Sequence, residues 1–463
     1  MNGDSGVRTH LRELRDTVPG MTSAPDRWWD CPLDVETFAA ESVGRARDAT
    51  ARLARARGLD VHVDTSAPLV AAGFAAYDHL RVDEKGVETW AELSGFVQTA
   101  DGWVRLHGNF PHHAAALREL YGIRDRAGLE SVLARRRAAD IEDEVAAAGG
   151  IAVRVRERDE WARHPQALAR AGHGWVECEE RGARPALPPL EIAGEGDALP
   201  LDGVRVLDFT RVLAGPTATQ LLACLGADVL RVDPPHRPEI LAQHLATGMG
   251  KRSTLLDMQR AEDRARALAL ASSADVILTG YRPGALARHG MGADDLARIA
   301  PQVVLAELSA WGGTGPWGGR AGFDSIVQAA TGIAVQCGSD GRPGALPVQA
   351  LDLATGHRLA AEVMDALAQA RARTLRLSLL GAAEELWALP PPEPEPGVPS
   401  ETLSKAAPAP GSSARPSALE VPRVKVRAGE QMLDVVPPTL RLDGRDIARD
   451  VGAYDAAAPA WCA

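Results

Sequence analysis

Residues with reactive side chains gather where short apolar runs of this chain give way to loops and helical segments. Asp352 follows the apolar run 346–351, a predicted strand, and precedes a helix predicted from about residue 354 to residue 370. An aspartate at that place commonly caps the helix, and the residues alone favour this interpretation. The alternative is a carboxylate nucleophile that the helix dipole helps to keep ionised. Asp324, in GFDSIVQAATG, is expected to cap another helix in the same manner.

Basic residues lie in segments that follow predicted strands. Lys251, Arg252, Arg282 and Arg288 are expected around one end of a sheet, and such a set suits phosphate groups. Each arginine by itself could equally be solvated surface, because arginine supplies almost all the positive charge of the chain. The glycine-rich stretch 311–319, WGGTGPWGG, is compatible with a lid that moves and with a rigid turn.

The histidines and cysteines show no motif of known chemistry. His112 and His113 are adjacent, have no acidic ligand at metal spacing, and are predicted to be solvated. His357 follows Asp352 by just over one helical turn; it could face the same pocket, but the helix surface is favoured. The five cysteines are scattered without C-x-x-C, and G-x-S-x-G is absent. A structural zinc site, a redox pair and a hydrolase elbow are therefore not indicated.

The segment 203–233, GVRVLDFTRVLAGPTATQLLACLGADVLRVD, is expected to position these residues. Its two apolar runs predict parallel strands, and the stretch between them predicts a helix that begins at Pro216 and ends at Gly226. This is one strand–helix–strand unit of a doubly wound sheet, in which ligands bind at the carboxyl ends of the strands. The loop lacks G-x-G-x-x-G, which argues against a nicotinamide or flavin site.

The length of 463 residues allows two or three domains. We expect an α/β fold with a doubly wound, Rossmann-like parallel sheet domain and a smaller α+β domain. Within the smaller domain, Asp101-Gly102 between two apolar runs predicts a hairpin over 95–107. The expected division is an N-terminal region containing the small domain (1–180), a linker (181–200), the sheet domain (201–389), a Pro-rich disordered linker (390–420) and a tail (421–463).

Charge and hydropathy limit the possible partners. The net charge of −11 argues against a general nucleic-acid binder, which would show a basic face. No segment approaches ~20 uninterrupted apolar residues, so no membrane span is expected. The N-terminus has no signal-peptide core, and a cytoplasmic protein is predicted.

Several strings together resemble the family III CoA-transferases, the CaiB/BaiF family. These are the segment 203–233, GKRSTLLDM, ADVILTGYRPGALARHGM, GFDSIVQAATG and ALDLATG, which cover most of 201–389. The resemblance implies transfer of CoA from an acyl-CoA to a free carboxylic acid, with Asp352 as the covalent nucleophile. It also implies a homodimer, interlocked in the family, and a reaction that needs no metal. The implied coenzyme A contacts are Val212, Leu213, Ala214, Leu256, Met258, Gly280, Tyr281, Arg282 and Arg288.

The chain also departs from the family pattern. GFVQTADGWVRLHGN and DEWARHPQ resemble the family's smaller domain but precede the sheet domain, so the order of domains looks permuted or rearranged. Pro234 replaces a basic residue that some members direct towards CoA. Racemases of the family have a histidine where this chain has Phe323, which disfavours racemisation or isomerisation of a 2-methylacyl-CoA. A catalytically silent CoA-binding or partner subunit is the remaining alternative, and Asp352 argues against it.

Overall fold

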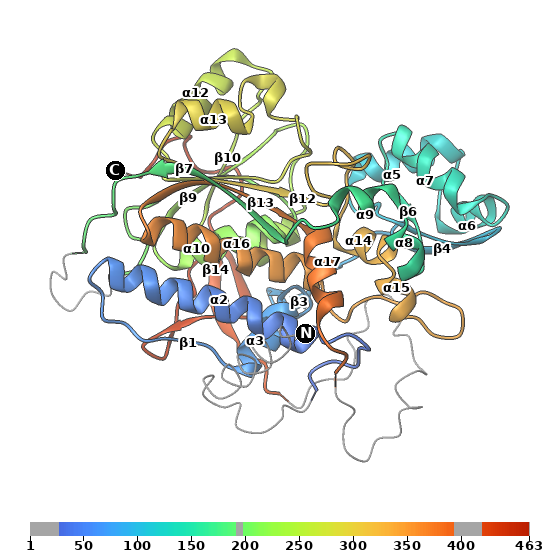
Figure 1. Cartoon of the computed structure of the whole chain (residues 1–463), viewed down its shortest axis with the longest axis horizontal. Coiled ribbons are helices and arrows are strands. Elements are labelled where there is room, and N and C mark those ends of the chain that lie inside the picture. The colour runs from blue at the N-terminus through green and yellow to red at the C-terminus, as the bar shows by residue number, and fades with distance from the viewer. Residues whose placement is uncertain (1–26, 191–197, 393–418, 463) are drawn as a thin grey trace.

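A seven-stranded sheet forms the centre of the molecule (Figure 1). The computed structural model describes residues 27–190, 198–392 and 419–462. The strand order is β10-β9-β8-β11-β12-β13-β7, and every neighbouring pair is parallel except β13 with β7. The strands are β7 (Val176–Ala183), β8 (Arg205–Phe209), β9 (Asp228–Asp233), β10 (Arg252–Leu255), β11 (Val276–Thr279), β12 (Val304–Ser309) and β13 (Arg371–Ser378).

Helices cover both faces of this sheet, so its strands are buried on both sides (Figure 1). Val206 and Leu278 face the helices α2 (Val35–Ala56), α10 (Ala214–Cys224) and α16 (Ala350–Ala368). Leu207 and Ile277, one position along each strand, face α12 (Ala261–Ser272) and α13 (Ala293–Ile299). The predicted doubly wound sheet is confirmed.

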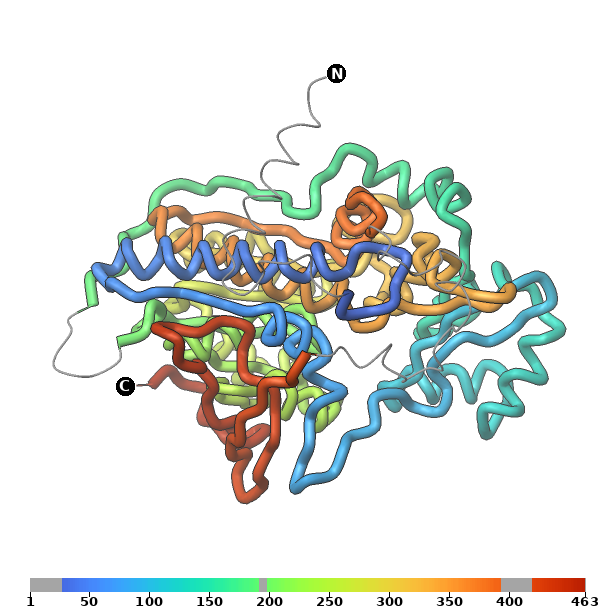
Figure 2. Tube along the Cα trace, turned by 90° about the horizontal axis from the view of Figure 1, so that it is seen from below, coloured from blue at the N-terminus to red at the C-terminus, as the bar shows by residue number. Residues whose placement is uncertain are grey.

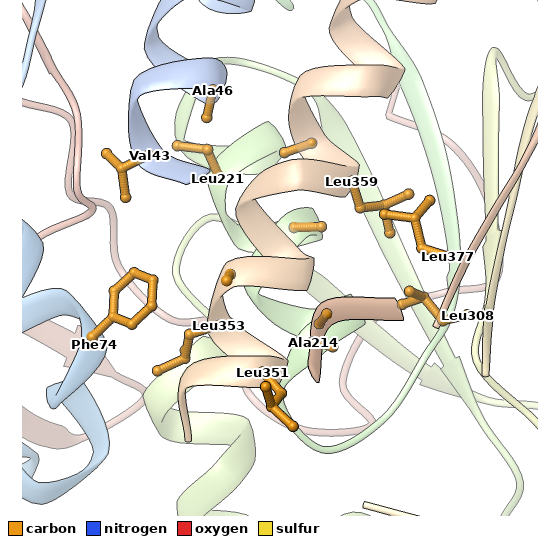
Figure 3. Close-up of a cluster of buried hydrophobic side chains, with 14 of the residues drawn as sticks. Val43, Ala46, Phe74, Ala214, Leu221, Leu308, Leu351, Leu353, Leu359 and Leu377 are labelled. Atoms are coloured by element: carbon orange, nitrogen blue, oxygen red, sulfur yellow. The ribbon is translucent and has the colours of Figure 1, made fainter. Parts of the chain in front are cut away.

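The packing of α2, α10 and α16 fixes the part of the chain that contains Asp352. Figure 3 shows Val43 of α2, Leu221 of α10 and Leu359 of α16 in one buried cluster. Gly356 lets α10 approach α16 closely, since a Cβ atom there would lie 2.6 Å from the carbonyl oxygen of Ala214. The start of α10 is thereby held against the first turns of α16.

The smaller α+β unit has its own core and lies to one side of the sheet (Figure 1). Its three strands are antiparallel in the order β4-β5-β6, and the predicted hairpin is the pair β4 and β5. The elements of this unit are β4 (Gly95–Thr99), β5 (Gly102–Leu106), β6 (Ala152–Arg154), α5 (Pro111–Tyr121), α6 (Arg126–Leu133) and α7 (Ala138–Ala147). Further short helices are α8 (Arg158–Ala162), α9 (Pro165–Arg170), α11 (Leu241–Thr247), η1 (Ala287–His289), α14 (Asp324–Ala330), α15 (Ile333–Gln336) and α17 (Leu379–Ala388).

Residues 63–82 lie beside the C-terminal segment, as the blue and red segments of Figure 2 show. Strand β15 of the C-terminal segment pairs with β2, and β16 pairs with β1. The elements are β1 (Val63–Asp64), α3 (Ala67–Phe74), α4 (Ala76–His79), β2 (Arg81–Val82), β3 (Lys85–Gly86), β14 (Val424–Ala428), β15 (Gln431–Val435), β16 (Arg441–Leu442) and β17 (Arg445–Asp446).

Some predicted elements differ from the structure. Residues 346–351 do not form the predicted strand; residues 350 and 351 are instead the first residues of α16. Strand β7 runs across the predicted start of the linker at residue 181 and pairs with β13. Most of the predicted Pro-rich linker, residues 393–418, lies outside the described residues. The proposed domain division and the permuted domain order stay predictions. In the described part of the chain, no helix is long and apolar enough to cross a membrane.

Replacement of Gly356 by alanine tests the close contact between α10 and α16. A methyl group at this position would push against Ala214, and overpacking of this kind typically costs about 1–3 kcal/mol. We expect Gly356→Ala to lower the melting temperature in thermal denaturation. Gly44→Ala in α2 is the matched control, because apart from the backbone of its own helix and its chain neighbours no atom lies within 4 Å of the place that its new methyl group would take. There the alanine should be neutral or should raise stability by up to ~1 kcal/mol. Equal effects of both substitutions would contradict the close contact.

Candidate active site

The loop after β8 is held by a buried carboxylate below it. Asp208 accepts hydrogen bonds from the backbone N–H of Thr210 at 2.9 Å and from the Thr219 hydroxyl at 2.6 Å. Gly215 packs tightly on this loop, since a Cβ atom there would lie 2.3 Å from Thr210. Val212 has a φ of 71°, which is strained for a β-branched residue. The loop therefore has one fixed shape at the start of α10.

Asp352 lies where the N-termini of two helices converge. It is the third residue of α16, and Gln349, not Asp352, is the N-cap, so the predicted capping role is wrong. The backbone N–H of Ala214, the first residue of α10, donates a hydrogen bond to the Asp352 carboxyl. Unpaired amides and the positive end of the dipole of α10 thus face this carboxyl group.

Asp324 is the second buried carboxyl group of the site. It is the first residue of α14 rather than its N-cap, and it accepts from the N–H of Leu351 and, at 3.0 Å, from that of Asp352. It therefore caps α16 instead of its own helix. The side-chain amide of Gln328 donates to the other oxygen of Asp324.

The two acids shift each other's protonation. Burial raises the pKa of Asp324 to about 6, although its hydrogen bonds favour the carboxylate. Burial, and then the charge of Asp324, raise the pKa of Asp352 well above its usual range, and the N–H of Ala214 opposes this. The proton therefore stays on Asp352 while Asp324 ionises first.

Two cavities meet at Asp352, and a third shares lining residues with one of them. The inner cavity, of about 210 Å³, lies between Asp352, Phe74, Arg105, His107 and Thr439. The middle cavity, of about 300 Å³, is lined by residues 210–212, 214–215, 280–283 and 321–323 together with Asp352. The outer cavity, of about 620 Å³, lies between residues 232–237, 256–259 and 281–289. Asp352 and Phe323 line both the inner and the middle cavity, and Tyr281 and Arg282 line both the middle and the outer cavity.

All nine residues expected to contact coenzyme A line these cavities. Leu213 lines the inner cavity. Val212, Ala214 and Gly280 line the middle one, and Leu256, Met258, Tyr281, Arg282 and Arg288 line the outer one. Within the described residues, Arg282 and Arg288 form no ion pair with a carboxylate, so their charges are available to a ligand. Arg237 also lines the outer cavity and was missed in the sequence; it lies three residues after Pro234 and supplies a positive charge beside it.

Lys251 and Arg252 do not join this site. They stand at the amino end of β10, whereas the cavities open at the carboxyl ends of the strands. Lys251 is 2% exposed and donates to the Thr219 hydroxyl at 2.8 Å, and Arg252 pairs with Asp228. The sequence-based expectation that both would bind phosphate at the same edge as Arg282 is wrong, because the strand begins at these residues rather than ending there.

The histidines also differ from the prediction. His113 is buried beside the middle cavity instead of solvated, and burial lowers its pKa to about 3. His357 is buried as well, lines the inner cavity, and has its Nε2 atom 2.8 Å from the Thr439 hydroxyl.

In the glycine-rich stretch 311–319, Trp311 and Trp317 are buried, and the side chain of Gln166 forms hydrogen bonds with the backbone of both. This packing favours the rigid turn.

Sequence reasoning missed the contribution of the small unit. Arg105 and His107 come from β5 and its end and line the inner cavity with Asp352. The alternation of side chains along this hairpin could have indicated them: Val104 and Leu106 face the core of the small unit, whereas Arg105 and His107 lie on the other face of the strand. Among the described residues, no group of three histidine, cysteine, aspartate or glutamate side chains is placed to hold a metal ion.

The raised pKa of Asp324 predicts a pH-dependent loss of stability. When folding raises the pKa of an acid, the protonated acid favours the folded state. This contribution to the free energy of unfolding is complete below the acid's usual pKa and is lost as the pH rises through the folded-state pKa. Between about pH 4 and about pH 6 the unsubstituted protein should therefore lose this contribution, whereas Asp324→Asn should not. The difference between their unfolding free energies should change by on the order of 2–3 kcal/mol in favour of Asp324→Asn. Urea unfolding across this range measures it. Asp60→Asn, at an exposed loop position, should track the unsubstituted protein; the same behaviour from Asp324→Asn would contradict the buried pair.

The sheet domain is similar in sequence to known proteins. Residues 201–388 match the model of a family described as CoA-transferase family III. The chain is 40% identical over 184 residues to a probable fatty acyl-CoA transferase, Rv3272, of Mycobacterium tuberculosis, a match covering 37% of this chain and 47% of that protein. It is 36% identical over 183 residues to the succinyl-CoA:glutarate CoA-transferase of Mus musculus, covering 37% of this chain and 42% of that protein.

The chain is also similar to a solved structure. The crystal structure of Rv3272 from M. tuberculosis aligns at 38% sequence identity with a TM-score of 0.40, over 42% of this chain and 57% of that one. The chain thus spans about half the length of the curated relatives that it matches.

Proposed function

Because residues 201–388 match the model of CoA-transferase family III, we propose that this chain transfers coenzyme A from an acyl-CoA to a free carboxylic acid through a covalent intermediate on Asp352. One observation supports the assignment above all others. The Asp352 carboxyl group receives the first N–H of α10, and it lies between the cavity lined by the expected coenzyme A contacts and a second, inner cavity. A nucleophile between two substrates needs this position.

The reaction proceeds through activated acyl groups of similar energy. Once Asp352 has lost its proton, its carboxylate attacks the thioester carbonyl, which gives a mixed anhydride and releases the CoA thiolate. The thiolate attacks the aspartyl carbonyl, so that the donor acid leaves and an aspartyl-CoA thioester remains. The acceptor carboxylate attacks this thioester, forms a second anhydride and releases the thiolate, which then attacks the acyl carbonyl. The new acyl-CoA and the free carboxylate of Asp352 result.

The surroundings of Asp352 suit these steps. Each attack on a carbonyl group creates a negative oxygen, and backbone amides with the positive end of a helix dipole stabilise it. Asp324 holds the first turn of α16 in place through the N–H groups of Leu351 and Asp352. Asp324 acts here as a positioning residue, because its oxygens are occupied by these donors and by Gln328.

Coenzyme A is proposed to occupy the outer and middle cavities. Arg282 lines both, and Arg237 and Arg288 stand beside it, so that the phosphates of the ligand would meet three arginines. Tyr281 and Gly280 line the path from these arginines towards Asp352. The thiol end of the ligand can then reach the nucleophile while its charged end stays near the molecular surface.

Replacement of Arg282 tests the proposed coenzyme A site. Loss of one charged donor to a phosphate should weaken CoA binding by roughly tenfold in Arg282→Gln, with the effect shrinking as salt is added. Isothermal titration with CoA measures this change. Arg298→Gln is the control, because that exposed arginine pairs with Asp295 on α13, away from the cavities. Unchanged affinity in Arg282→Gln would place coenzyme A elsewhere.

Replacement of Asp352 tests the nucleophile. Asp352→Asn keeps the size of the side chain and removes the attacking oxygen, so the transfer rate should fall at least about a thousandfold. The assay follows new acyl-CoA formed from an acyl-CoA and a free acid. Asp365→Asn, at the other end of the same helix and paired with Arg52, is the control and should stay active. Full activity of Asp352→Asn would refute the role of Asp352.

The same preparation separates the alternatives. A racemase would destroy the optical activity of a chiral 2-methylacyl-CoA with no acceptor acid present. A catalytically silent subunit would bind CoA and transfer nothing. Phe323 lines the inner cavity and has no group that could move a proton, so the site supports transfer over racemisation.

A further inference from the structure

Arg105 in β5 is a buried cation without an anionic partner. Its side chain belongs to a residue that is 4% exposed, and its guanidinium lies between the rings of Trp90 and Phe96, 4.8 and 4.7 Å from their centres. The Nε atom has no hydrogen-bond partner, and no carboxylate of the described residues lies within 4.0 Å of the guanidinium. A buried charge of this kind is costly unless an anion joins it.

The free guanidinium belongs to the inner cavity. Val104 and Leu106 face the core of the small unit, so Arg105 is on the opposite face of β5, and it lines the same cavity as Asp352. His107 lies on that face as well, stacked on Phe323 at a ring distance of 3.9 Å. The Nδ1 atom of His107 is buried and has no partner. Two unsatisfied polar groups of the small unit thus line the proposed substrate cavity.

Arg105 is set back from the reacting carboxyl group. Both residues line the inner cavity, but no carboxylate of the described residues, that of Asp352 included, lies within 4.0 Å of the Arg105 guanidinium. An anion bound to Arg105 would therefore lie at a distance from the carbon atom that reacts. A substrate with a single carboxyl group cannot occupy both places.

We propose that Arg105, with His107 beside it, binds the remote carboxylate of a dicarboxylic acid, so that this chain transfers CoA to or from dicarboxylic acids. The inference rests on the proposed CoA transfer and adds the substrate class. The guanidinium offers paired donors that match two carboxylate oxygens. The rings of Trp90 and Phe96 hold it flat and keep water away, and neutral His107 can donate from Nδ1 in one tautomer.

The unsubstituted protein gives the first test. Succinate, glutarate and adipate are compared as acceptors with their monoamides, which have the same shape but no second charge. The donor is propionyl-CoA, and the measured quantity is kcat/KM. At least one diacid should exceed its monoamide by about tenfold to a hundredfold, since charge-assisted hydrogen bonds to Arg105 are lost in the amide. Equal rates for every pair would overturn the proposal.

Variants of Arg105 give the second test. Arg105→Gln should bring the ratio of diacid to monoamide close to one, and Arg105→Lys should leave an intermediate ratio because the charge stays but the paired donors go. The exposed Arg135 of the same unit supplies the control, and Arg135→Gln should keep the original ratio. A ratio that survives Arg105→Gln would overturn the proposal, as would its loss in Arg135→Gln. If the Arg105 variants do not fold, the comparison of acids and amides in the unsubstituted protein decides.

Equilibrium binding separates this proposal from the proposed function. Glutarate and its monoamide are titrated calorimetrically into the unsubstituted protein and into Arg105→Gln. A protein that transfers CoA to none of the acids refutes the proposed function, while glutarate binding that needs both its second charge and Arg105 still supports the anion site. Transfer to acids without any such binding preference refutes the anion site alone.

Discussion

The burial of two neighbouring carboxyl groups, Asp324 and Asp352, is the constraint on which the rest of the site depends. Two buried acids at one place would repel each other if both were ionised. The structure resolves this by giving Asp324 the backbone donors of α16 and a side-chain amide, and by leaving Asp352 with the N–H of Ala214. Asp324 thereby stabilises the start of α16, and Asp352 keeps oxygen atoms that can react. Both residues are aspartates, so their different roles follow from their different hydrogen-bond partners.

Close helix packing makes this arrangement possible. Gly356 allows the start of α10 to contact α16, and Gly215 allows the same helix to press on the loop after β8. Asp208 pins that loop from below with Thr210 and Thr219. The small α+β unit then closes the inner cavity from the other side, with His107 stacked on Phe323 and Arg211 over the ring of Phe110. The site is thus built from segments that are more than 200 residues apart in sequence.

The sequence predicts the sheet domain well, because strands buried on both faces leave long apolar runs and the loops follow them in order. The segment 203–233 forms the predicted strands β8 and β9 around α10, and the nine residues expected to contact coenzyme A line joined cavities. The prediction fails where tertiary contacts decide. The apolar run before Asp352 is typical of a strand, yet its last two residues begin α16. The reason is that Asp324, in another helix, accepts a hydrogen bond from the backbone N–H of Asp352 in the first turn of α16. The alternation of the hairpin places Arg105 on the face away from the small core, but only the fold brings that face of β5 to Asp352.

The covalent role of Asp352 is tested most directly by peptide mass spectrometry after the protein is incubated with an acyl-CoA and hydroxylamine. Hydroxylamine attacks an activated aspartyl carbonyl and leaves a stable hydroxamate. The proposed mechanism predicts this modification on the peptide that contains Asp352, and its dependence on acyl-CoA. An unmodified Asp352 in a protein that turns over acyl-CoA, or a modification on Asp324 instead, would contradict it.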